Sequence, residues 1–92
     1  MTISFKFPVW ILTLSKLYHY NGSNIEMYGT KIVRDLNIST AHIYRMLSLF
    51  LDKNYIIFRQ QRINTAKKIF SLTPQGLKIS KLCYDLVCGV EK

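Results

Sequence analysis

The stretch that decides the fold of this chain spans residues 28–76 and reads YGTKIVRDLN (28–37), IST (38–40), AHIYRMLSLFLDKN (41–54), YIIFRQQ (55–61), KKIFSL (67–72) and LTPQG (72–76). Its first three parts have the apolar spacing of a short helix, a turn and a second, longer helix. The next two are apolar runs around a polar tip, which indicates a β-hairpin, and LTPQG opens a final helix. The stretch therefore predicts a helix-turn-helix followed by a basic hairpin.

Capping residues set the expected bounds of the helices. The first is expected at about residues 8–20, because proline at position 8 suits the start of a helix, where its missing N–H would be unpaired anyway. The second is expected at about residues 30–36, and Ser39 can cap the third. Residues 24–27 are expected to form either a short edge strand or the lead-in to the second helix.

The third helix divides into two faces. The residues expected to be buried have the spacing i, i+3, i+4, i+7 and i+8, and they are Ile43, Met46, Leu47, Phe50 and Leu51. The opposite face carries Thr40, Ala41, His42, Tyr44, Arg45 and Ser48. Asn54 follows this helix at a position that favours left-handed dihedrals, and asparagine is the best non-glycine choice there.

The remainder is expected to complete an α+β fold in one domain, residues 1–92. Residues 56–58 and 69–72 alternate as expected of a hairpin ribbon that is buried on one side. Thr73 can cap the last helix, with proline in its favoured place at position 74. That helix is expected to run toward residue 90 with an apolar stripe formed by Ile79, Leu82, Cys83, Leu86, Val87 and Val90.

The charge balance favours a polyanionic partner. Thirteen Lys and Arg against five Asp and Glu give a formal net charge of +8 at pH 7. Charge alone fits a solvated surface equally well, but its distribution favours nucleic acid. Only Asp35 and Asp52 are acidic between residues 31 and 68, where the basic residues are Lys31, Arg34, Arg45, Lys53, Arg59, Arg62, Lys67 and Lys68.

The segments HIYRMLSLFLDKNYI (42–56) and KKIFSLTPQG (67–76) together resemble the recognition helix, wing and L-T-x-x-G helix of winged-helix regulators of the PadR and MarR type. The resemblance covers about residues 28–82. Asn54 stands where that family usually has glycine, a tolerable departure. The small size, the two alanines and the many isoleucines and tyrosines also resemble the small winged-helix proteins of viruses of hyperthermophilic archaea.

The winged-helix resemblance implies a homodimer built by the first and last helices, with the third helix in the DNA major groove and the wing near the minor groove. The candidate DNA-binding residues are Lys31, Arg34, Ser39, Thr40, His42, Tyr44, Arg45, Arg59, Arg62, Asn64, Lys67 and Lys68. Arg45 is expected either to read guanine or to contact phosphate. Tyr44 is expected either to contact the DNA backbone or to steady the second helix.

A homodimer is also expected from the residues, because the first and last helices carry more apolar surface than so small a monomer can bury. The candidate interface residues are Trp10, Ile11, Leu14, Leu82, Cys83, Leu86, Val87 and Val90. Cys83 and Cys88 lie five apart on one helix, about 140° apart around its axis, so an intrachain disulfide is not expected. They are expected to be either buried thiols or candidates for a disulfide between subunits.

Other classes of function find little support in the sequence. The acidic residues are scattered, no nucleophile motif or glycine-rich phosphate loop occurs, and the histidines and cysteines lack zinc-site spacing. No enzyme activity, cofactor or metal is therefore expected. The longest apolar run, residues 7–12, is far shorter than the ~20 residues that span a bilayer, and the start lacks a signal-peptide cleavage site. A cytoplasmic location is expected (the host cytoplasm for a viral protein).

The leading hypothesis is a homodimeric transcriptional regulator that binds double-stranded DNA in a sequence-specific way. A winged helix that docks on an acidic protein partner is one alternative. A non-specific or architectural nucleic-acid binder is the other, and composition does not separate it from the first.

Overall fold

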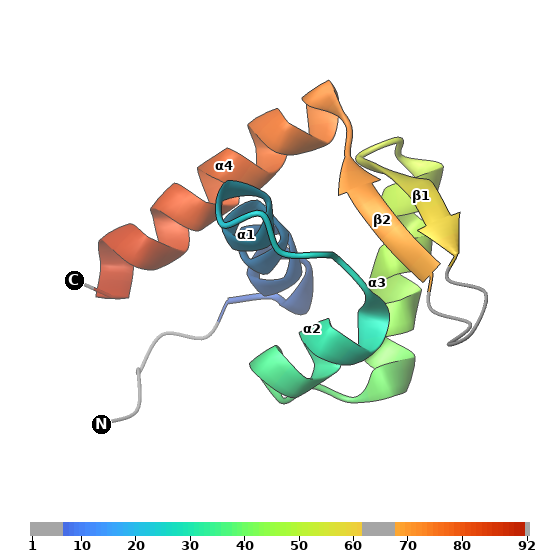
Figure 1. Ribbon diagram of the computed structural model, residues 1–92. Helices are drawn as coiled ribbons and strands as arrows, with labels where there is room; N and C mark the ends of the chain where they lie inside the picture. The colour runs from blue at the N-terminus through green and yellow to red at the C-terminus, as the bar shows by residue number, and fades with distance from the viewer. Residues whose placement is uncertain (1–6, 62–67, 92) are drawn as a thin grey trace.

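The computed structural model describes residues 7–61 and 68–91. Its elements follow the order helix, helix, helix, strand, strand, helix (Figure 1). Their bounds are α1 (Val9–Gly22), α2 (Gly29–Leu36), α3 (Thr40–Asp52), β1 (Ile56–Gln61), β2 (Lys68–Leu72) and α4 (Pro74–Glu91). These elements confirm the predicted α+β fold with its helix-turn-helix, hairpin and long last helix. Of the predicted bounds, none differs from the structure by more than two residues.

Helix α1 lies at the centre of the molecule. It packs along α4 and also contacts α2, α3 and β2. Leu14, Leu17 and Tyr20 on α1 are almost completely buried, because they face these elements. The rest of the core cluster comes from the other elements and the segment before α2, and its members are Met27, Ile32, Ile43, Leu47, Phe50, Ile56, Phe70 and Cys83.

The turn between α2 and α3 is fixed by local hydrogen bonds. Asn37 ends α2 in the left-handed conformation, with φ of 56°. Ser39 caps α3 as predicted, because its hydroxyl accepts the N–H of His42 at 3.3 Å. Beyond the other end of α3, Asn54 has φ of 63°, and the N–H of Tyr55 returns to the carbonyl of Phe50 at 2.9 Å. The predicted left-handed asparagine is therefore confirmed.

The LTPQG segment joins the end of α3 to the start of α4. The Thr73 hydroxyl donates to the Asn54 carbonyl at 2.7 Å and accepts the N–H of Gly76 at 2.9 Å, so Thr73 caps α4 as predicted. The Thr73 N–H also donates to the Tyr55 carbonyl at 3.0 Å. A Cβ on Gly76 would lie 1.8 Å from that same carbonyl oxygen. Glycine is therefore required there by the close approach of another part of the backbone.

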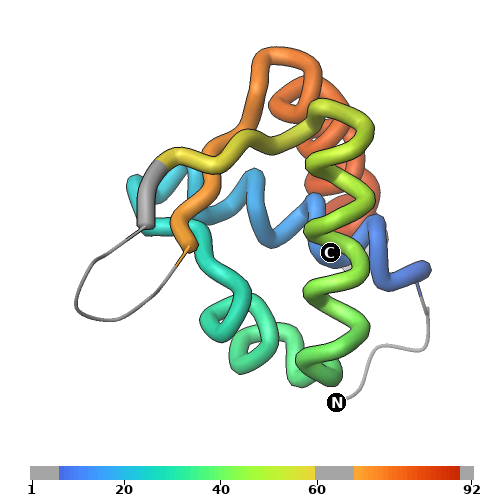
Figure 2. The backbone as a smooth tube through the Cα atoms, turned by 90° about the vertical axis from the view of Figure 1, so that its right-hand side faces the viewer, coloured from blue at the N-terminus to red at the C-terminus, as the bar shows by residue number. Residues whose placement is uncertain are grey.

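The hairpin departs from the predicted alternation. Phe58 pairs with Phe70 but Gln60 pairs with Ile69, which leaves Arg59 as an extra residue in β1. Ile69 and Phe70 of β2 are both buried, whereas Ile57 and Phe58 of β1 are 48% and 47% exposed. Figure 2 shows β1 leaving the end of α3 and β2 leading back to the start of α4.

Two smaller expectations are also decided by the structure. Residues 24–27 do not form a continuous strand. Instead Met27 makes one antiparallel bridge to Phe70, whose N–H donates to the Met27 carbonyl at 2.9 Å. Leu51, expected to be buried, is 40% exposed, because it lies at the edge of the apolar face of α3, past Leu47 and Phe50.

A polar contact ties α1 to α2. The buried Tyr20 donates its hydroxyl proton to the Asp35 carboxylate at 2.5 Å. Burial and this hydrogen bond raise the pKa of Tyr20, and the hydrogen bond lowers the pKa of Asp35. The Lys31 ammonium lies 5.8 Å from the centre of the Tyr20 ring, which adds a cation–π contact to the same junction.

We expect the Tyr20–Asp35 contact to give the folded state two limits of pH stability. Because the pKa of Asp35 is lowered, its contribution is lost as the pH falls below about 4; because the pKa of Tyr20 is raised, its contribution is lost as the pH rises above about 10. Chemical denaturation across pH measures both limits. Tyr20→Phe should remove this loss of stability at alkaline pH and reduce the loss at acidic pH. Tyr18→Phe, which removes a phenol from the same helix, is the matched control, and an unchanged profile for Tyr20→Phe would contradict this assignment.

Candidate nucleic-acid interface

The outward face of α3 is polar and cationic. Its residues recur every three to four positions, and Thr40, Ala41, Tyr44, Arg45 and Ser48 are all exposed while His42 is half-buried. Ile43, Leu47 and Phe50 occupy the opposite face and hold the helix against the core. The division of α3 into two faces is therefore confirmed, apart from Leu51. This arrangement presents an arginine and several hydroxyl groups to solvent along one side of a rigid helix.

Tyr44 is held in place by α2. A Cβ built on Gly29 would lie 2.4 Å from Cζ of Tyr44, so the phenol ring occupies the space that a side chain at position 29 would need. Tyr44 nevertheless remains 41% exposed. Both expectations for this residue are therefore compatible with its position: the ring packs on the start of α2, and part of it stays available to a ligand.

The candidate basic residues occupy different surroundings. Arg34, Arg45, Arg59 and Lys68 are exposed. Lys31 is half-buried and engaged with the Tyr20 ring, which places its ammonium at the junction of α1 and α2. The remaining candidates of the hairpin tip lie outside the described residues, and they are Arg62, Asn64 and Lys67.

The structure brings Tyr44 and Lys68 to the rim of one groove between α3 and the hairpin. Tyr28, Gly29 and Thr30, at the start of α2, line the same groove and were not among the sequence candidates. No spacing rule signals them, because they belong to the loop and first turn before the apolar pattern of α2 begins. The Tyr28-Gly29 pair was the available hint, since a glycine at the start of a helix can admit a neighbouring ring.

The candidate dimer residues fall into two groups. Leu82, Leu86 and Trp10 are exposed, at 66%, 48% and 42%. Leu14, Cys83 and Val87 are instead buried within the protomer, because α1 and α4 pack on each other. Those three side chains are therefore corrected from candidate interface to core. Ile11 is half-buried, and the side chain of Val90 lies outside the described part of the chain.

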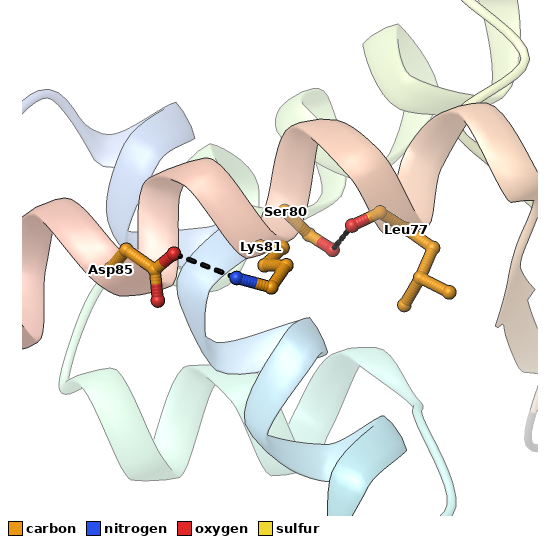
Figure 3. Close-up of polar contacts among 4 residues, drawn as sticks. All are labelled: Leu77, Ser80, Lys81 and Asp85. Carbon is orange, nitrogen blue, oxygen red and sulfur yellow. Dashed lines mark hydrogen bonds and ion pairs between the residues drawn. The ribbon is translucent and has the colours of Figure 1, made fainter.

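The outward side of α4 has an apolar row beside a charged one. Leu82 and Leu86 are four residues apart and therefore lie one above the other. The neighbouring row contains Lys81 and Asp85, whose ammonium and carboxylate lie 3.0 Å apart (Figure 3). The Ser80 hydroxyl, on the buried side, donates to the Leu77 carbonyl at 3.1 Å. The apolar surface that Leu82 and Leu86 expose on α4 is therefore narrower than the predicted stripe.

The two cysteines are free and differ in surroundings. Cys83 is buried against α1, and burial raises the pKa of its thiol. Cys88 is half-buried beside Tyr84, and a hydrogen bond between them raises the pKa of the Tyr84 hydroxyl. Among the described residues no group of three or more His, Cys, Asp or Glu could hold a metal ion. In that same part of the chain no helix is long and apolar enough to cross a membrane.

Solved structures with the same arrangement establish the fold. AF1382 from Archaeoglobus fulgidus is 17% identical and superposes with a TM-score of 0.75 over 90% of this chain and 88% of its own. Staphylococcus aureus MepR in a complex with DNA is 19% identical, with a TM-score of 0.73 over 94% of this chain. The adhesin competence repressor AdcR from Streptococcus pyogenes is 18% identical, with a TM-score of 0.70 over 92% of this chain. The fold is therefore the winged helix that the sequence predicted.

This likeness does not extend to the whole length of the regulators. The chain spans 61% of MepR and 62% of AdcR, whereas it spans most of AF1382. No family model matches the sequence, and no curated protein matches it. The shared feature is consequently the winged-helix arrangement of helices and hairpin.

Proposed function

We propose that this chain is a transcriptional regulator that binds double-stranded DNA through α3 and the β1–β2 hairpin. The observation that carries the proposal is the exposed face of α3, which is polar and cationic on a winged-helix scaffold. A helix-turn-helix places such a face in the major groove. The MepR structure of the same fold is a complex with DNA, and MepR is described as a transcription regulator, which supports the assignment by analogy.

We expect α3 and the hairpin to make different kinds of contact with DNA. Arg45, exposed on α3, can donate two hydrogen bonds to guanine in the major groove. Arg59 in β1 and Lys68 in β2 are exposed on the hairpin, where cations can neutralise phosphates and release counterions. Sequence preference would therefore come mainly from α3, while the hairpin would supply affinity for any duplex.

Selection of bound duplexes from a random pool tests this function. We expect an enriched motif, and affinity for that motif that falls steeply with salt. Equal binding of selected and random duplexes would favour an architectural role instead. Failure to bind any duplex at low salt, with the protein folded, would contradict DNA binding and favour a protein-interaction module.

We further propose that the protein acts as a homodimer through the outward row of α4. Leu82 and Leu86 are exposed apolar side chains on one side of that helix, and an exposed apolar patch commonly marks an interface. A two-fold dimer would present two copies of α3 and predicts a pseudo-palindromic motif in the selected duplexes.

Leu86→Lys is expected to weaken the dimer at least about tenfold, because two copies of the added charge would be buried near the symmetry axis. Sedimentation equilibrium across protein concentration measures the change. Leu77→Lys is the matched control: residue 77 is also exposed and apolar on α4 but lies about 180° around the helix from residue 86. A wild-type protein that sediments at 10.8 kDa at all concentrations would contradict the dimer.

A disulfide between subunits, if the two α4 helices meet, should form through Cys88. Cys83 is enclosed in the core, whereas Cys88 is partly accessible near the end of the helix. Non-reducing gels of the oxidised protein should therefore show a covalent dimer that Cys88→Ser abolishes and Cys83→Ser preserves. If the oxidised wild-type protein forms no covalent dimer, both cysteines are free thiols and the disulfide prediction is wrong.

A further inference from the structure

An apolar and aromatic surface lies within the face proposed to contact DNA. It lines a groove of about 460 Å³ between the start of α2, the outward face of α3 and the hairpin. Tyr44, Leu51 and Phe58 line this groove and are 41%, 40% and 47% exposed. The Phe58 ring lies 5.9 Å from that of Phe70, so the buried ring supports the exposed one. Phosphates and the edges of paired bases are contacted mainly by hydrogen-bonding groups, so the proposed function leaves this surface without a role.

The polar lining of the groove suits a nucleic-acid strand. Lys68 is the single charged residue among those that line it, and the hydroxyls of Thr30 and Ser48 also border it. No acidic side chain is present among these lining residues, and the chain carries a net charge of +8. Proteins that bind single-stranded nucleic acid combine these same two features, a cationic path for the backbone and aromatic side chains on which bases stack.

Only an unpaired base can use the aromatic surface fully. In a paired duplex the flat faces of each base are covered by the neighbouring base pairs, and only the base edges are open in the grooves. A base that leaves the stack offers a flat face, and the cost of exposing it is smallest when the base is mismatched or already single-stranded. The groove lies between α3 and the hairpin, so a base displaced from a duplex bound there would not have to travel far.

We infer that this groove holds one unpaired base of a DNA strand, and that the protein binds a duplex with such a base more tightly than a fully paired one. The base lies against Phe58 and Tyr44, and the phosphate attached to its nucleotide lies near Lys68. The contact with the base stands on the groove alone. The preference among duplexes rests on the proposed function, because it requires α3 and the hairpin to hold the paired part of the DNA.

Fluorescence anisotropy with two labelled single strands of equal length tests the contact with the base. One strand is oligothymidylate, and the other has the same phosphates but abasic sugars in place of the nucleosides. We expect the wild-type protein to bind oligothymidylate about fivefold or more tightly than the abasic strand, because stacking of one base on an aromatic side chain has effects of at least that size. Phe58→Leu removes the ring but keeps an apolar side chain, so it should abolish most of this preference. Phe58→Trp should retain it.

Ile57→Ala is the matched control, since Ile57 is the neighbour of Phe58 in β1, is similarly exposed and does not line the groove. The preference for oligothymidylate should be unchanged in this variant. Lys68→Gln should weaken both strands alike, because they carry the same phosphates. Circular dichroism establishes that each variant is folded. Equal affinity of the wild-type protein for the two strands would overturn the contact with the base, and so would a preference that Phe58→Leu leaves intact.

A series of duplexes built on the selected motif tests the second half of the inference. Each duplex carries one extra, unpaired thymine at a different position in or beside the motif. We expect at least one of them to bind about fivefold or more tightly than the fully paired duplex, and Phe58→Leu to remove that gain. A series with no gain at any position would overturn the preference. If the protein binds no paired duplex at all, the proposed function fails, and the comparison of the two single strands still decides the contact with the base.

Discussion

Replacing Gly76 with alanine is expected to destabilise the protein by about 3 kcal/mol or more, because the new methyl group would overlap a backbone atom. The Cβ would lie 1.8 Å from the Tyr55 carbonyl oxygen and 2.6 Å from its carbon. That carbonyl is fixed in turn, since it accepts the N–H of Thr73. Relief of the overlap would require the start of α4 to move away from the end of α3.

Thermal unfolding measures this effect, and a loss of about 3 kcal/mol corresponds to a fall of roughly 12–24 °C in Tm for a domain of this size. Gly89→Ala is the matched control on the same helix, since a Cβ at position 89 meets nothing within 4 Å. That change should stabilise the helix by a few tenths to about 1 kcal/mol. Equal effects of the two substitutions would contradict the structural role of Gly76.

Arg45→Ala is expected to weaken binding to the selected duplex by about 1–3 kcal/mol, or roughly 5- to 150-fold, and to bring it closer to the binding of random DNA. The side chain is exposed on α3 and is not part of the core, so stability should not change. Fluorescence anisotropy with selected and random duplexes at one salt concentration measures the two affinities.

Lys68→Gln separates charge from recognition in the same assay. Lys68 is an exposed residue at the start of β2, and we expect it to contact phosphate. Its loss should weaken all duplexes alike and reduce the salt slope by about one. If Arg45→Ala instead weakens selected and random duplexes equally, Arg45 has a positioning role and recognition lies elsewhere in the interface.

Local rules predicted the helices well because the sequence carries both the apolar period and the caps. Ser39 and Thr73 form the hydrogen bonds expected of helix caps, and Asn54 adopts the left-handed conformation expected after α3. The exposed face of α3 followed from the same period. These features depend on residues within four positions of one another, so no knowledge of the tertiary contacts was needed.

The remaining features depend on contacts between distant segments. The bulge at Arg59 is set by the register of two strands, and Phe58 is 47% exposed although it pairs with the buried Phe70. The apolar stripe of α4 correctly indicated burial, but α1 covers Cys83 and Val87 and leaves Leu82 outside. Likewise, the contact of Tyr44 with Gly29 joins two helices. Periodicity alone does not assign a partner to an apolar face.

The hydrogen bonds at Thr73 have a consequence for the geometry of DNA binding. They fasten the carbonyls that follow α3 to the first turn of α4, so the two helices should move as one rigid body. An 18-residue helix is about 27 Å long, and a rotation of about 10° at its far end displaces the other end by about 5 Å. That displacement exceeds the rise of ~3.4 Å between base pairs. In the proposed dimer, the angle at which two α4 helices cross would thus set the spacing between DNA half-sites.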